Sequence, residues 1–164
     1  MIAIPKRTKR ILAVLLPVLA GIGVLAWIAQ AITGTRMHHR IRAAAAESDT
    51  VVLQRYYGRE IIESSEMDAE AFLAWMDGNL VPLPARLDIS LCWTPHHRIL
   101  LQNDEGSRNV EICFECDLFK FESAQRKLPE PWRQAFGELF SKHGIPAKMP
   151  SEAEIEEALA RSPK

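Results

Sequence analysis

The chain has 164 residues, with 20 Lys and Arg against 21 Asp and Glu, and its charge is distributed unevenly. Residues 1–32 contain four basic residues and no acid, whereas residues 33–164 contain 16 basic and 21 acidic residues. Nucleic acid binding requires basic side chains clustered over phosphates. The acidic balance of the larger part therefore excludes nucleic acid as the expected partner, and the length accommodates one modest domain.

A long apolar segment lies near the N-terminus. No charged residue occurs between Arg10 and Arg36, a span of 25 positions, and residues 11–32 are almost wholly apolar. A helix of about 20 such residues spans the roughly 30 Å hydrocarbon core of a bilayer. Because soluble core helices are rarely apolar all the way round for so long, the segment predicts a single transmembrane helix over residues 11–32, with the lipid bilayer as its partner.

The basic residues that flank this segment predict its orientation. The N-terminal flank, residues 1–10, narrowly outweighs the far flank in positive charge. It contains the amino terminus and Lys6, Arg7, Lys9 and Arg10, whereas the far flank contains Arg36, Arg40 and Arg42. Positive flanks stay in the cytoplasm, so residues 33–164 are expected outside the cytoplasmic (inner) membrane. The alternative is a signal peptide cleaved after Ala29-Gln30-Ala31. The apolar run is longer than a usual signal h-region, which favours an uncleaved anchor.

Residues 33–50 are interpreted as a juxtamembrane segment. Ala43 to Ala46 favour a helix, and Arg36, His38, His39 and Arg40 are expected at the level of the lipid headgroups.

The next elements alternate between strand and helix patterns. Residues 51–57 are rich in β-branched and aromatic side chains, which predicts a strand. Ser65 resembles an N-cap, and Phe72, Trp75 and Met76 then recur at helical spacing, which predicts a helix over residues 66–77.

A β-hairpin is predicted in the middle of the chain. Residues 86–93 alternate between apolar and polar, and after Pro95 a strand resumes over residues 97–102. A loop over residues 103–107 contains a glycine, and residues 108–116 form the returning strand.

Two more helices follow. Trp132, Phe136, Leu139 and Phe140 predict a helix over residues 131–143. The last helix starts with a capping box, in which Ser151 is followed by an acid three residues on, and runs to Arg161. Its apolar stripe consists of Ile155 and Leu159 alone, so this helix is expected to be loosely attached.

Together these elements predict an α+β protein. One transmembrane helix is followed by a small antiparallel sheet, with helices 66–77 and 131–143 packed on one face. The extracytoplasmic domain is expected to cover residues 51–146, and residues 147–164 form an extended segment and an acidic helix.

All three cysteines lie within the predicted hairpin region, together with two histidines. The candidate ligands are Cys92, His96, Cys113 and Cys116, with His97 as an alternative to His96. Three thiolates and an imidazole suit a closed structural zinc site. Cys113 and Cys116 would point to opposite faces of a regular strand, so they can share a metal or a disulfide only if the backbone turns between them. Three alternatives to zinc stay open: a disulfide between two of the cysteines, unpaired cysteines packed in the core, and a catalytic dithiol.

The hairpin residues resemble a family of small uncharacterised bacterial proteins. The shared pattern is Cys92-Trp93-Thr94-Pro95-His96-His97, then Ile112-Cys113-Phe114-Glu115-Cys116, then a helix closing on Gly144-Ile145-Pro146. Many of these proteins are exported or lipid-anchored, and no activity is known for them. The resemblance therefore implies that the cluster is one unit, and it implies no reaction.

Two hypotheses for the function follow. The sequence contains no nucleophile elbow, P-loop or H-E-x-x-H motif, so an enzyme is not the leading interpretation. The first hypothesis is a membrane-anchored extracytoplasmic binding or accessory module that contacts a protein partner at the membrane. The second is a metal-handling or thiol-dependent enzyme that uses the Cys/His cluster, which requires the cluster to line an open cleft.

Overall fold

The computed structural model describes residues 17–25, 36–82 and 93–161. Residues 17–25 are helical, and the predicted membrane helix over residues 11–32 otherwise lies outside the described part. Across the described ranges, no helix combines the length and the apolarity needed to cross a bilayer.

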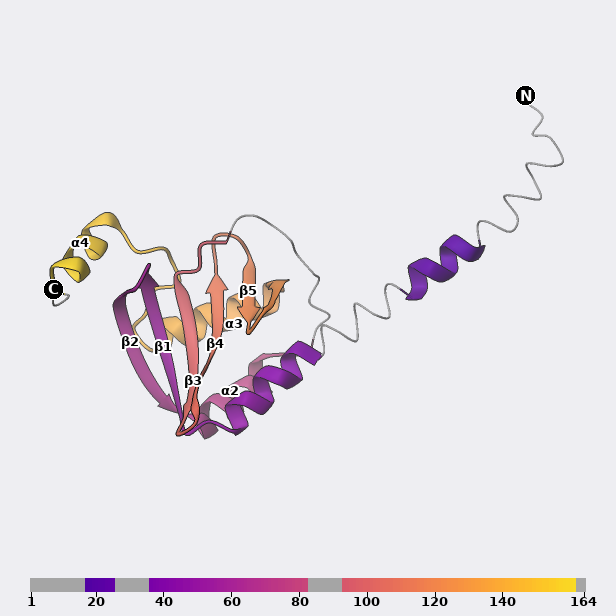
Figure 1. Ribbon diagram of the computed structural model, residues 1–164, viewed down its shortest axis with the longest axis horizontal. Coiled ribbons are helices and arrows are strands. Elements are labelled where there is room, and N and C mark those ends of the chain that lie inside the picture. Colours follow the sequence, from indigo (N-terminus) through magenta and orange to yellow (C-terminus); the bar gives the residue numbers. More distant parts are fainter. Residues whose placement is uncertain (1–16, 26–35, 83–92, 162–164) are drawn as a thin grey trace, which may run out of the picture.

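A six-stranded antiparallel sheet forms the centre of the domain, in the order β2-β1-β3-β4-β5-β6 (Figure 1). The strands are β1 (Thr50–Tyr57), β2 (Glu60–Asp68), β3 (His97–Asn103), β4 (Gly106–Cys113), β5 (Leu118–Phe121) and β6 (Ala124–Lys127). This confirms the predicted α+β class with an antiparallel sheet. The hairpin of β3 and β4 is also confirmed, and its turn is fixed by Asn103, whose side-chain oxygen accepts hydrogen bonds from the backbone N–H groups of Glu105 and Gly106.

Alternation along the strands builds the core. Residues directly opposite one another in an antiparallel pair share a face, and β1 places Leu53 opposite Ile99, which in turn lies opposite Val110. All three are fully buried. The same alternation places Arg55 and His97, which are also opposite each other, on this core face.

Three helices share this hydrophobic core: α2 (Ala69–Asn79), α3 (Glu130–Lys142) and a helix at residues 36–46. The α3 helix lies across one face of the sheet (Figure 1). Its Trp132 and Phe136 are fully buried, and Trp132 donates a hydrogen bond from Nε1 to the carbonyl of Val81 at 2.8 Å. The predicted helix over residues 131–143 is thus confirmed within one residue at each end.

The helix at residues 36–46 belongs to the folded domain. Met37, Ile41, Ala44 and Ala45 are buried in the common core. His38 is buried as well, 5.9 Å from Trp132 between ring centroids, and burial lowers its pKa. The folded domain therefore includes residues before the predicted boundary at residue 51. Arg36, His39 and Arg40 are exposed, whereas His38 packs in the domain and is not available for the predicted position among lipid headgroups.

The start of α2 was predicted wrongly. Ser65 lies inside β2, opposite Leu53, and the N-cap is Asp68, whose carboxylate accepts a hydrogen bond from the N–H of Ala71 at 2.7 Å. Pairing with β1 extends β2 through the residues that resemble a helix start. The predicted strand over residues 86–93 lies outside the described residues, except for Trp93, which is not in a strand.

The last helix, α4 (Glu152–Arg161), contacts the edge strand β2 (Figure 1). The predicted capping box is present, since the backbone N–H and the hydroxyl of Ser151 both donate to Glu154 Oε2 at 2.7 Å. Ala158 is the one buried residue of α4, and Leu159 is 55% exposed. This small apolar contact agrees with the expected loose attachment.

Candidate functional site

The predicted ligands lie at the end of the sheet where β3 begins and β4 ends. His96 precedes β3, His97 is its first residue, and Cys113 is the last residue of β4. Residues 114–117 form a turn into β5, with Asp117 at a φ of 52°. The backbone therefore turns between Cys113 and Cys116, as a shared role would require. Cys92, the remaining candidate ligand, lies outside the described residues.

The two described cysteines differ in chemical state. Cys113 is a free, buried thiol whose pKa is raised by burial, and its Sγ lies 3.9 Å from Glu115 Oε2. Cys116 is disulfide-bonded. A buried thiol with a raised pKa is a poor nucleophile, and a disulfide sulfur supplies no thiolate for a metal. These states are typical of a structural role for both residues.

The predicted zinc set needs three thiolates, but Cys116 is disulfide-bonded and cannot serve as one of them, and Cys92 lies outside the described residues. In the part of the chain that is described, no three His, Cys, Asp or Glu side chains are grouped so that they could hold a metal ion.

His97 is enclosed by aromatic rings. Its ring centroid lies 4.9 Å from that of Phe114 and 5.1 Å from that of Phe140, both at near-perpendicular angles, and the side chain is fully buried. Its Nε2 lies 2.8 Å from the carbonyl oxygen of Pro146, which can only accept, so Nε2 carries the proton. Burial lowers the pKa of His97 to about 4, so the ring is neutral at physiological pH.

His96 has different surroundings. It is 3% exposed, and its ring stacks on Tyr57 with 5.9 Å between centroids and 6° between planes. Neither histidine opens onto a cleft among the described cavities. A groove of about 340 Å³ between α2 and α3 is lined by Trp75, Leu139 and His143 among others, and by neither His96 nor His97.

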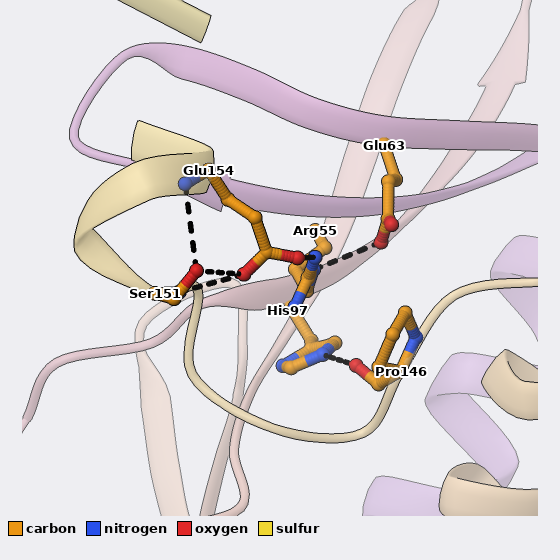
Figure 2. Close-up of polar contacts among 6 residues, drawn as sticks. All are labelled: Arg55, Glu63, His97, Pro146, Ser151 and Glu154. Carbon is orange, nitrogen blue, oxygen red and sulfur yellow. Dashed lines mark hydrogen bonds and ion pairs between the residues drawn. The ribbon is translucent and has the colours of Figure 1, made fainter. Parts of the chain in front are cut away.

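A charged residue that the sequence analysis did not single out lies beside His97. Arg55 is 0% exposed and projects from the core face of β1. It lies opposite His97 on the neighbouring strand β3 (Figure 2). Its Nε lies 2.8 Å from Glu63 Oε2 on β2, and a terminal nitrogen, NH2, donates to Glu154 Oε1 on α4. We refer to Arg55, Glu63, His97 and Glu154 as the Arg55 cluster.

The signal for this cluster was present in the strand pattern. Val51, Leu53 and Arg55 have the same parity along β1, and the first two are core residues. A cation at a core position of a strand requires a buried partner. The partners could not be identified from spacing alone, since Glu154 is 99 residues away.

Glu154 joins the last helix to the sheet. Its Oε2 accepts from Ser151, and its Oε1 accepts from Arg55, so one carboxylate caps α4 and docks it (Figure 2). The backbone and hydroxyl of Ser151, and then Arg55, lower the pKa of Glu154 to about 2. The carboxylate therefore stays ionised throughout the physiological range.

The Arg55 cluster carries an excess of negative charge. One guanidinium faces two carboxylates and a neutral imidazole, so the sum of charges is about −1 near neutral pH. The Nε and NH1 atoms of Arg55 have no partner of good hydrogen-bond geometry in the described chain, because the Glu63 carboxylate is close in distance but poorly aligned. Guanidinium groups recognise carboxylates, and both carboxylates of the cluster lie against the single guanidinium of Arg55.

Comparisons of the chain with protein-family models, with curated proteins and with solved structures gave no match.

Proposed function

We propose that this protein is a single-pass, membrane-anchored module whose domain lies outside the cytoplasm and binds a protein partner at the membrane. The anchor is the apolar segment over residues 11–32, with residues 1–10 in the cytoplasm. In the described part of this segment, apolar side chains are widely exposed, with Leu19 at 56% and Leu25 at 68%. A surface of exposed apolar side chains is favourable in contact with lipid.

The disulfide-bonded Cys116 is the observation that carries the extracytoplasmic placement. Disulfides form and persist in oxidising compartments and are rare in the cytosol. The excess of basic residues before the apolar segment independently favours the same orientation.

The burial of residues in the Cys/His cluster supports a binding module over an enzyme. Cys113 and His97 are buried, and the pKa of each is shifted toward its neutral form by burial. Catalytic thiols need a depressed pKa and access to substrate, and a general base needs to reach the proton it removes. The thiol-dependent enzyme that the sequence left open therefore gains no support from the described residues.

A reporter fusion tests the proposed topology. A reporter enzyme that is active only outside the cytoplasm, fused after Lys164, is expected to be active. The matched control replaces Lys6, Arg7, Lys9 and Arg10 by Ala, which removes the basic N-terminal flank and should lower reporter activity. An inactive fusion in the unmodified chain would refute the orientation.

Fractionation of the same cells tests the anchor itself. The full-length chain should stay in the membrane pellet after alkaline extraction, and mass spectrometry should find its N-terminal residues intact. A released protein that begins near residue 32 would identify the apolar segment as a cleaved signal peptide.

A further inference from the structure

The contact between Glu154 and Arg55 resembles the contact between a ligand and its binding site. The guanidinium is 0% exposed, whereas the Glu154 side chain is 34% exposed, so the cation lies one carboxylate below the protein surface. The carboxylate that Arg55 binds is therefore in contact with solvent on the α4 side. The unpaired NH1 of Arg55 leaves donor capacity in the site beyond what α4 satisfies.

The remaining contacts of α4 are few. Ala158 is its one buried residue, and Leu159 is half exposed. The segment that leads into α4 contains Pro146 and Pro150, which favour an extended chain. The ion pair between Glu154 and Arg55 of β1 therefore joins α4 to the sheet by charge, beside a small apolar contact.

We infer that the Arg55 cluster is a binding site for a carboxylate at the start of an acidic helix, and that Glu154 of α4 occupies it as an exchangeable ligand. The ligand class is a segment with a Ser-x-x-Glu capping box, in which the glutamate presents one oxygen to its own helix N-terminus and the other to Arg55. The inference rests on the described domain and does not depend on the membrane anchor.

The short chain between the domain and α4 determines how strongly Glu154 competes with other ligands for Arg55. A ligand joined by a short chain competes at a millimolar effective concentration, so the site in the unmodified protein is closed to weak competitors. A competing helix of the same chemistry gains access when the charge of Glu154 is removed. Glu154→Gln is a suited variant, because Gln also serves in a capping box and α4 keeps its N-terminal cap.

Binding of a labelled peptide to the purified full-length chain tests this site. The probe is a fluorescent peptide with the sequence of residues 150–161, and the readout is fluorescence anisotropy. E154Q is expected to bind the peptide roughly tenfold or more tightly than the unmodified chain, because the intramolecular competitor is weakened. E156Q is the matched control, since Glu156 is exposed on the same helix and carries the same charge. It should bind as the unmodified chain does.

A second peptide keeps the test independent of protein stability. The same peptide with Gln in place of Glu154 should lose most of its affinity for the E154Q chain, and the R55Q/E154Q chain should not bind the original peptide. Equal binding by E154Q and E156Q, or equal affinity of the two peptides, would overturn the inference. Light scattering of E154Q mixed with the unmodified chain then tests whether α4 of a second copy is the ligand: a mixed dimer supports this source, and monomers exclude it.

Discussion

His97 is a buried histidine whose neutral form is built into the fold. Its ring is packed against Phe114 and Phe140 and donates to the carbonyl of Pro146. Burial is the main cause of its low pKa, while the neighbouring Arg55 also disfavours a positive charge on the ring. A residue with this environment acts through its shape and its hydrogen bond, since it does not titrate near neutral pH.

Stability is therefore expected to fall as the pH is lowered from about 6.5 to about 4. In that window the unfolded chain binds a proton at His97 and the folded chain does not, because the folded pKa is about 4 against an ordinary value of 6.5. The contribution is fully present above pH 6.5, and its loss amounts to about 3 kcal/mol in free energy of unfolding. Urea denaturation at a series of pH values measures it. The control is H97Q, which keeps an amide donor and should show a shallower pH dependence; parallel curves would contradict the prediction.

Arg55 and its two carboxylates are unequal in burial, and this decides which substitution is worse. Glu63 and Glu154 are each about one third exposed at the side chain, whereas Arg55 is fully buried. Removing the cation leaves two carboxylates that water still reaches. Removing both carboxylates leaves a buried cation without a counter-charge, which is strongly unfavourable.

The E63Q/E154Q double variant should therefore lose more stability than R55M. Met fills part of the volume of the arginine stem and needs no partner. Chemical denaturation midpoints of the two variants, measured at neutral pH, give the ranking. A larger loss for R55M would mean that the arginine contributes by packing and hydrogen bonding more than by charge.

At the scale of elements, α3 contributes five buried side chains to the core, three of them aromatic. Phe136 is fully buried, and its ring lies 5.5 Å from that of Trp75 on α2 and 6.3 Å from that of Trp132. This residue therefore joins two helices over the sheet.

Phe136→Ala should lower the free energy of unfolding by about 3–5 kcal/mol, because a large buried ring leaves a cavity that its neighbours fill incompletely. Leu159→Ala is the control, since Leu159 is 55% exposed on α4 and should cost little. Thermal unfolding followed by circular dichroism compares both with the unmodified chain. A negligible shift for the Phe136 variant would show that α3 does not pack as described.

The elements that the sequence predicted well are those with a regular apolar pattern. β1 is rich in β-branched and aromatic side chains, burial alternates along β3, and the second half of β4 carries apolar residues on one face. α3 repeats its large side chains at helical spacing. β2 was assigned in part to a helix because its residues Ser65 and Asp68 resemble an N-cap, and because an edge strand with polar side chains has a weak pattern. Tertiary pairing with β1 overrides the local preference.

The candidate site was predicted only in part. The Cys/His positions were singled out from their types and spacing, whereas the Arg55 cluster depends on β2 and α4 meeting β1 in space. A contact between residues 99 positions apart produces no periodic pattern in the sequence. In the sequence, the charged residue Arg55 at a core position of β1 was the feature that indicated this cluster.

A disulfide is expected to join the described turn to the segment before β3. The sequence holds three cysteines, Cys113 is free and Cys116 is bonded, so Cys92 is left as the partner within one chain. Closing a loop of this size stabilises a fold by about 3–4 kcal/mol in the chain-entropy model. Peptide mapping by mass spectrometry without reduction should find residues 92 and 116 linked and Cys113 alkylated. A covalent dimer through Cys116 would contradict the intramolecular pairing.

At the scale of the whole molecule, the helix at residues 36–46 decides how far the domain can stand from its anchor. The helix is buried in the common core, and three residues, 33–35, separate it from the end of the apolar segment. Three residues reach at most about 10 Å even when fully extended. If residues 11–32 anchor the chain as proposed, this short connection is expected to keep the domain close to the bilayer surface.

A domain held by so short a connection to the proposed anchor is expected to remain close to the membrane surface. A Gly/Ser insertion of about 15 residues after Gly34 adds a flexible spacer with a root-mean-square length of roughly 20 Å. Energy transfer from a dye on the exposed Arg36→Cys position to an acceptor lipid should be strong in the original chain and weaker in the insertion variant. Equal transfer in both would mean that other contacts hold the domain to the lipid. A partner that this domain reaches must itself come within one domain's height of the same membrane.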